Sequence, residues 1–167
     1  QASTFLIQDM DGAGKLRAKT YGAFKDEIEA AITKLKPSDT LNVVMSSLSG
    51  GTGSVIAPLV TKELLEQGKT VIVVGIASDD SIIEIDNSIK SIKTYNNFAI
   101  STNTPVSMFY CNPDSRSTTD KTVISLLMSL GVITDAENTE EFDTTDLHHF
   151  VNYQKVTQLP IGLSNIF

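Results

Sequence analysis

Ten residues rich in glycine and hydroxyl side chains, 46–55, are the part of this sequence best suited to chemistry. They read SSLSGGTGSV, and they lie between the apolar run 41–45 and a segment with helical periodicity. Glycine lets the backbone turn tightly and come close to a ligand. The first turn of a helix presents unpaired N–H groups and a partial positive charge, which suit a phosphate. We interpret the segment as a phosphate-binding turn; the alternative is a plain glycine-rich turn capped by Ser54.

Several better-known motifs do not fit the two glycine clusters of the chain. The G-x-x-x-x-G-K-[ST] loop needs a lysine directly after its last glycine, and none follows Gly53; at Gly14-Lys15 the first glycine of the motif is replaced by Asp9. Both clusters lack the third glycine of G-x-G-x-x-G, and G-x-S-x-G is absent. These absences argue against a Walker-type loop, a dinucleotide fingerprint and a hydrolase nucleophile elbow.

Polar side chains also follow two later apolar runs. Asp79, Asp80 and Glu84 come after residues 71–77, and Asn112 comes after residues 106–111. A carboxylate can accept hydrogen bonds from both ribose hydroxyls, while an amide can donate and accept at a base edge. The alternatives are a helix-capping cluster for the acids and an Asn-Pro turn for Asn112.

A second acidic pair, Asp143 and Asp146, stands three residues apart near the end of the chain. On the first turn of a helix both would face the same side, where they could orient a water or cap the helix. His148 and His149 follow at once and raise the possibility of a metal site. Adjacent side chains on a helix diverge, so at most one histidine could join the acids, and we expect no metal site here.

The elements that must position these residues alternate along the chain. Apolar runs predict strands over residues 4–8, 41–45, 71–77 and 106–111, with a further strand beginning within 154–163. Helical spacing predicts helices over residues 21–35, 54–67, 82–95, 119–130 and 146–151. Such alternation favours a parallel sheet with helices on both faces, in which ligands bind at the carboxyl ends of the strands.

Length, composition and charge limit which classes of protein this chain can belong to. The chain has 167 residues, 41% apolar and 20% charged, which is typical of one folded domain. A net charge of −7 argues against broad nucleic-acid binding. No apolar run approaches the roughly 20 residues of a membrane helix, and no leader pattern is visible. With the single cysteine Cys111, these features lead us to expect a cytoplasmic protein. Because the chain opens with Gln, we expect further residues upstream.

The glycine segment resembles a known signature. Residues 49–55 (SGGTGSV) are similar to the GGGTGSG loop of the tubulin/FtsZ superfamily, and Gly12-Ala13-Gly14 matches a second phosphate turn of that family. The stretch FDTTDLHHFVNY resembles the family's catalytic loop and the helix after it. That stretch and NSIKSIK look closest to the phage-encoded, PhuZ-type tubulins. The resemblance implies a GTP-binding domain over residues 1–153, incomplete at its N-terminus, with 154–167 starting a C-terminal domain.

The resemblance also implies roles for individual residues. The β- and γ-phosphates would contact Gly50, Gly51, Thr52, Gly53 and Ser54, and the γ-phosphate would approach the backbone of Gly12, Ala13 and Gly14. Glu84 would bind the ribose, while Asn112 and Asp120 would read the guanine edge. Lys15 is not required by the family. Asp143 and Asp146 would reach the nucleotide of a neighbouring subunit and polarise the attacking water.

The implied function is GTP hydrolysis coupled to head-to-tail assembly into filaments, with GTP or GDP and Mg²⁺ as cofactors. The expected partners are GTP and further copies of the chain, without direct nucleic-acid or membrane binding. In a phage, the filament would position phage DNA in the host cytoplasm. Ser49 and Val55 replace the outer glycines of the signature, and Glu141 replaces a common asparagine. A non-hydrolysing structural homologue or a flavodoxin-like cofactor domain therefore remain the alternatives.

Overall fold

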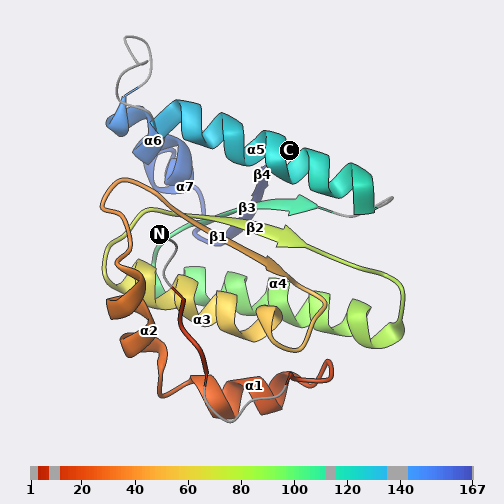
Figure 1. Ribbon diagram of the computed structural model, residues 1–167. Helices are drawn as coiled ribbons and strands as arrows, with labels where there is room; N and C mark the ends of the chain where they lie inside the picture. The colour runs from red at the N-terminus through yellow and green to blue at the C-terminus, as the bar shows by residue number, and fades with distance from the viewer. Residues whose placement is uncertain (1–3, 8–11, 112–115, 135–142, 167) are drawn as a thin grey trace.

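The computed structural model describes residues 4–7, 12–111, 116–134 and 143–166, and within these ranges it forms one parallel sheet with helices on both faces (Figure 1). The strands lie in the order β1-β2-β3-β4, and all neighbouring pairs are parallel. Their bounds are β1 Asn42–Ser47, β2 Val71–Ile76, β3 Val106–Cys111 and β4 Leu163–Ile166. The fold class predicted from the alternating pattern is confirmed.

The helices form two layers. Helices α3 (Gly53–Glu66) and α4 (Ile82–Thr102) cover one face of the sheet, with α1 (Arg17–Phe24) and α2 (Ile28–Leu35) packed outside them. The other face carries α5 (Arg116–Thr134), α6 (Thr144–Val151) and α7 (Tyr153–Val156). No helix in the described residues is long and apolar enough to cross a bilayer.

The strand β2 lies between β1 and β3 and is buried on both faces. Val71 and Val73 pack toward the α3–α4 layer with Leu64 and Tyr95, while Ile72, between them, packs with Leu147 on the other side. A strand with two covered faces needs an unbroken apolar run, because successive side chains point to opposite faces. This is why residues 71–77 could be assigned from the sequence.

Two expected elements near the N-terminus differ in the structure. Residues 4–7 form no strand; instead the Phe5 ring packs edge-on against Phe24, with 6.4 Å between ring centroids, and the Lys34 ammonium lies 5.9 Å from the Phe5 ring centre. The expected helix over residues 21–35 is two helices, because a turn follows the buried Phe24 and α2 sets off in a new direction.

Helix α4 buries an unexpected face. Its isoleucine spacing predicts the helix correctly, yet Ile85 and Ile89 are exposed. The buried positions carry mainly small or polar side chains: Asn87, Ser88, Ser91, Tyr95 and Ala99. Of these residues, Asn87 and Ser91 hydrogen-bond to backbone carbonyls of the neighbouring loops, as buried polar groups usually do.

Candidate functional site

The glycine-rich loop lies at the carboxyl end of β1, where the sequence pattern places it. The Leu48 N–H donates to the carbonyl of Ile76, which ties the start of the loop to the end of β2. The Ser47 and Ser49 hydroxyl oxygens lie 2.9 Å apart, and the Gly50 N–H donates to Ser47 Oγ at 3.2 Å. These bonds hold the first half of the loop against the strand.

The second half of the loop opens α3 with free donors. Among the described residues, the N–H groups of Gly51, Thr52, Gly53 and Ser54 have no hydrogen-bond partner. Thr52 is the N-cap residue but makes no side-chain cap bond, and its side chain is exposed. A run of unpaired N–H groups at the start of a helix of 14 residues is a good arrangement for binding phosphate oxygens.

The Ser54 hydroxyl has a partner within the protein. The side chain is fully buried and donates to the Gly50 carbonyl, so Ser54 could serve a phosphate through its backbone N–H rather than its hydroxyl. The alternative of a plain turn capped by Ser54 is wrong about the cap, because the N-cap of α3 is Thr52. The two positions that depart from the family signature, Ser49 and Val55, are buried at 4% and 5% exposure. Their side chains therefore point into the fold and not toward the free amides.

The turn Gly12-Ala13-Gly14 packs directly against this loop. A Cβ on Gly51 would come within 2.7 Å of the Ala13 Cβ and 2.8 Å of the backbone at Lys15 and Leu16. Gly12 and Gly14 have φ of +62° and +55°, which glycine adopts without strain. The two predicted phosphate turns are thus brought into contact, and only glycine fits at position 51 without displacing the other turn.

Glu84, the candidate ribose ligand, stands on the first turn of α4 beside the same two turns. Its carboxylate lies 3.0 Å from Lys15 Nζ and accepts from the Ser81 hydroxyl at 3.1 Å. The bond from Lys15 is the largest of the effects that lower the pKa of Glu84. Asp79 and Asp80 are exposed just before the helix. Lys15, which contacts Glu84 here, was not among the site residues predicted from the sequence.

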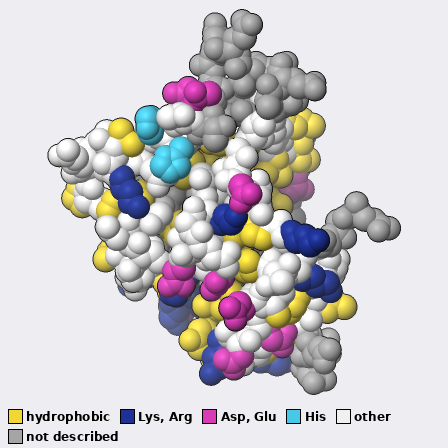
Figure 2. All heavy atoms as spheres, turned by 90° about the vertical axis from the view of Figure 1, so that its left-hand side faces the viewer, with side chains coloured by type: hydrophobic (Ala, Val, Ile, Leu, Met, Phe, Trp, Pro, Cys, Tyr) yellow, Lys and Arg dark blue, Asp and Glu magenta, His cyan; other side chains and the backbone are white. Residues whose placement is uncertain are grey.

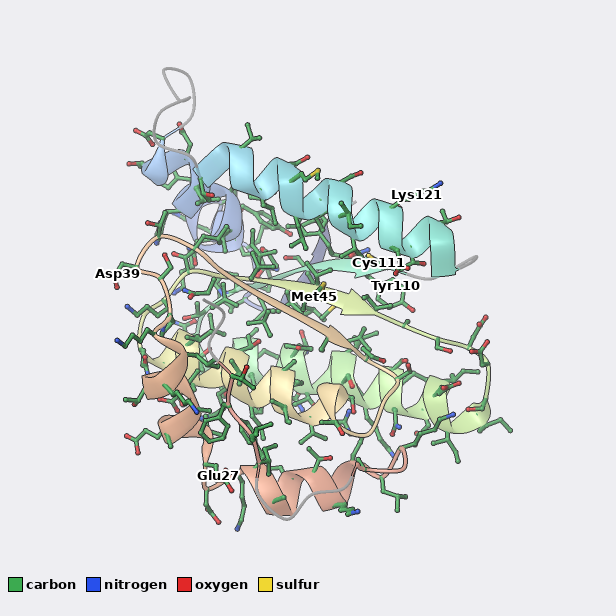
Figure 3. The ribbon with its side chains drawn as sticks, in the orientation of Figure 1. Glu27, Asp39, Met45, Tyr110, Cys111 and Lys121 are labelled. Atoms are coloured by element: carbon green, nitrogen blue, oxygen red, sulfur yellow. The ribbon has the colours of Figure 1, made fainter. Side chains whose placement is uncertain are left out.

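The guanine-edge candidates are only partly placed by the structure. Asn112 lies outside the described residues. Asp120 is exposed near the start of α5, and its neighbour Lys121 lies at the same end of the sheet as Tyr110 and Cys111 (Figure 3). Asp120 is therefore at the carboxyl edge, together with the glycine turns. Cys111 is partly buried at the end of β3, and burial raises the pKa of its thiol.

Asp143 and Asp146 lie at the opposite edge of the sheet. Helix α6 stands over the amino ends of the strands, where His148 and Asn152 line a small cleft with Val71 and Pro105. Figure 2 looks onto this edge and shows both histidine side chains at its surface. The acidic pair and the glycine turns are therefore separated by the length of the strands, and the structure does not bring them together within one chain.

The acidic pair forms the N-terminal cap of α6. Asp143 Oδ1 accepts from the N–H groups of Thr145 and Asp146 at 2.7 and 2.9 Å, and the Asp143 N–H donates to Asp146 Oδ2 at 3.1 Å. The bond from the Asp146 backbone is the first cause of the lowered pKa of Asp143. Both side chains are exposed, so they remain accessible to a partner. In the described part of the chain, no three His, Cys, Asp or Glu residues are grouped as a metal site would require.

The chain is similar in sequence and fold to known phage proteins. It is 28% identical over 154 residues to a phage tubulin-like protein of Pseudomonas phage PhiPA3, covering 90% of this chain and 48% of that protein. A solved protofilament of TubZ from bacteriophage PhiKZ matches with a TM-score of 0.90 at 25% identity, over 97% of this chain and 53% of that one. The phage tubulin PhuZ, solved with GDP, shares the fold with a TM-score of 0.85 at 23% identity, over 96% and 52%.

The chain corresponds to only part of the length of its relatives. It spans about half the length of the curated relatives it matches, and no protein-family model matches it. The resemblance to the phage-encoded tubulins is thus confirmed in sequence and in fold, because the chain has the parallel sheet flanked by helices of the phage tubulin structures that it matches.

Proposed function

We propose that the chain is the nucleotide-binding part of a GTP-hydrolysing protein that assembles head to tail into filaments. The observation that carries the proposal is the contact of two glycine turns at Gly51, beside four unpaired N–H groups at the start of α3. Two turns this close could both contact one polyphosphate. The solved relatives support the proposal: one is a protofilament, and another was solved with GDP.

The positions of the acids favour a site shared between subunits. Asp143 and Asp146 lie at the amino edge of the sheet, so they cannot reach a nucleotide held at the carboxyl edge of the same chain. A second copy, stacked with its amino edge on that carboxyl edge, would bring its acids to the γ-phosphate. Assembly would then complete the hydrolytic site, and hydrolysis would depend on it.

Exposed apolar side chains at both edges support such a contact. Near the carboxyl edge, the first half of α4 exposes Ile82, Ile83, Ile85 and Ile89. At the amino edge, α6, α7 and the turn after them expose Phe150, Tyr153, Val156 and Leu159. Because the two surfaces differ, one copy's carboxyl edge would meet the next copy's amino edge. A heterologous contact between opposite edges produces an open filament when its rotation does not close a ring.

The proposed chemistry is phosphoryl transfer to water. The amides at the start of α3 and in the Gly12-Ala13-Gly14 turn would bind the phosphate oxygens, and Glu84 would accept from the ribose. Asp146 or Asp143 of the adjacent copy would orient the attacking water and accept its proton. Magnesium, when bound, would neutralise phosphate charge. Since the described residues offer no acidic cluster, we expect phosphates and water to supply most of its ligands.

Phosphate release measured over a range of protein concentrations tests the proposal. With the full-length protein and GTP, the rate per subunit should rise above a threshold concentration, together with light scattering from filaments. A rate that is independent of concentration would mean a self-contained site. Filaments without phosphate release would identify a non-hydrolysing homologue. In a phage, we expect the filaments to position phage DNA in the host cytoplasm.

A further inference from the structure

The polar face of α4 contacts the backbone of both glycine turns. Asn87 is 4% exposed, and its Nδ2 donates to the carbonyl of Lys15 at 3.1 Å and to the carbonyl of Ser49 at 3.0 Å. Lys15 follows the Gly12-Ala13-Gly14 turn, and Ser49 belongs to the glycine-rich loop. One amide group thus uses both of its N–H donors to join two loops that are 34 residues apart in the sequence.

Ser91 and Arg17 continue this network one helical turn away. The Ser91 hydroxyl is fully buried and lies 2.9 Å from the Leu48 carbonyl. Arg17, at the start of α1, places Nη1 2.6 Å from Ser91 Oγ and 2.9 Å from the carbonyl of Ser54. The same nitrogen lies 3.3 Å from the carbonyl of Asn87. The guanidinium therefore joins α1, the first turn of α3 and α4.

Arg17 is a partly buried cation whose hydrogen-bond partners carry no charge. It is only partly exposed, and no carboxylate lies within ion-pairing distance among the described residues. Its donors point at carbonyl and hydroxyl oxygens instead. A planar guanidinium can direct several N–H groups at fixed angles, which a lysine ammonium cannot. The guanidinium thus contacts the backbone of α3 and α4 from α1, and its hydrogen bonds rather than an ion pair account for its position.

We propose that Arg17, Asn87 and Ser91 are positioning residues that hold the two glycine turns at the separation needed to bind one triphosphate. This inference rests on the proposed function. The side chains would not touch the nucleotide; they would act through the backbone of the turns. The contact at Gly51 shows why the separation matters, because the turns already touch there and a small displacement of one turn would move the free amides at the start of α3 relative to the other.

The decisive variant is Asn87→Asp, which keeps the side-chain shape but removes both N–H donors. Asn97→Asp is the matched control, because Asn97 lies on the same helix with an exposed side chain. The full-length protein is titrated with GTP and with GDP. We expect Asn87→Asp to lower GTP affinity about 10- to 100-fold and GDP affinity less, since the turn after Gly12 would serve the γ-phosphate. Asn97→Asp should leave both affinities unchanged.

Arg17 provides a second, graded test. Arg17→Met should reduce the ratio of GTP to GDP affinity, while Arg17→Lys, which keeps the charge but not the planar fork, should restore it only in part. A merely structural role would lower the unfolding temperature of each variant and leave that ratio unchanged in the folded protein. Equal ratios in the wild type, Asn87→Asp and Arg17→Met proteins would overturn the proposal.

Hydrogen exchange of the nucleotide-free protein separates this proposal from the proposed function. Asn87→Asp should speed exchange of the hydrogen-bonded amides of Leu16 and of residues 48–50, with helix α5 unaffected. If the wild type binds no GTP yet this local change occurs, the proposed function fails and the positioning network stands. If GTP binds but neither exchange nor the affinity ratio responds to Asn87→Asp, the network proposal fails alone.

Discussion

At the residue scale, Gly51 should be the position most sensitive to added volume. In Gly51→Ala the new methyl group would lie less than 3 Å from the backbone at Lys15 and Leu16, and backbone cannot move aside cheaply. Overpacking of this kind costs about 1–3 kcal/mol of the free energy of unfolding. Separating the turns should also weaken GTP binding, by about tenfold for each 1.4 kcal/mol of lost binding free energy.

Gly22→Ala is the matched control for this substitution. Gly22 lies inside α1, is exposed, and a Cβ there would meet nothing within 4 Å. Alanine should raise the free energy of unfolding there by up to about 1 kcal/mol, the usual helix preference over glycine. Chemical denaturation and GTP titration of both variants check the pair. Equal GTP affinity in Gly51→Ala and wild type would mean that the contact between the turns is not used in binding.

Asp146 is best probed by Asp146→Asn, which removes the negative charge but keeps an oxygen to accept from the Asp143 N–H. The subunit retains its own turns, so GTP affinity should not fall. Loss of a group that orients water and takes up its proton should slow hydrolysis about 10²–10⁴-fold. Filaments should then persist, because the GDP state is reached slowly. Light scattering and phosphate release measured in one sample test this.

Two outcomes would contradict the split-site assignment of Asp146. If Asp146→Asn loses GTP binding, then Asp146 belongs to the nucleotide site of its own chain. If hydrolysis is unchanged, Asp146 serves only the cap of α6, and Asp143 becomes the remaining candidate.

At the element scale, the sequence predicts best where local pattern and tertiary environment agree. Residues 71–77 are β-branched and continuous, and β2 is buried on both faces, so composition and environment coincide. Helix α4 is the opposite case, since isoleucines at helical spacing indicate the helix but not its buried face. That face is chosen by carbonyls at Lys15, Leu48 and Ser49, which lie 38 to 72 residues away. A local window cannot detect such partners.

The candidate site divides in the same way. The glycine-rich loop follows β1, so its place at the carboxyl edge of the sheet could be expected from topology. The Gly12-Ala13-Gly14 turn follows no strand in the described residues, so its contact with that loop required the structure. Lys15 and Arg17 carried no signal of their own, because a lone basic residue beside a turn is common on protein surfaces. The capping pattern of Asp143 and Asp146 was visible in their three-residue spacing. The free N–H groups at Gly51 and Gly53 required the structure, since hydrogen-bond partners cannot be read from residue types.

The cap of α6 should make stability depend on pH. Hydrogen bonds from the backbone of Asp146 and Thr145 lower the pKa of Asp143 in the folded chain. A carboxyl group with a lowered folded-state pKa adds stability above its unfolded pKa of about 3.9 and loses it as the pH falls through the folded value. The unfolding temperature of wild type should therefore exceed that of Asp143→Ala at pH 6, and the difference should shrink below pH 4. A difference that does not change with pH would mean that the charge of Asp143 is not what stabilises the cap.

At the scale of the whole molecule, the two unlike edges of the sheet predict how copies associate. Ile82 is 85% exposed near the carboxyl edge, and Phe150 is 44% exposed at the amino edge. If filaments form by stacking these edges, Ile82→Glu should disable one end of each subunit and Phe150→Glu the other. Either variant alone should form no filaments in GTP, because each contact requires one edge of each kind.

A mixture of the two variants makes the prediction specific. Ile82→Glu keeps an intact amino edge and Phe150→Glu an intact carboxyl edge, so one of each can form a single contact and no more. Analytical ultracentrifugation of an equimolar mixture in GTP should find dimers that neither variant forms alone. Tyr21→Glu, at a position of α1 that is 52% exposed and lies at neither edge of the sheet, is the control and should polymerise normally. The mixed dimer should also hydrolyse GTP, since its one contact places the acids of Ile82→Glu on the nucleotide of Phe150→Glu. Filaments in either variant alone, or no dimers in the mixture, would mean that the subunits associate through other surfaces.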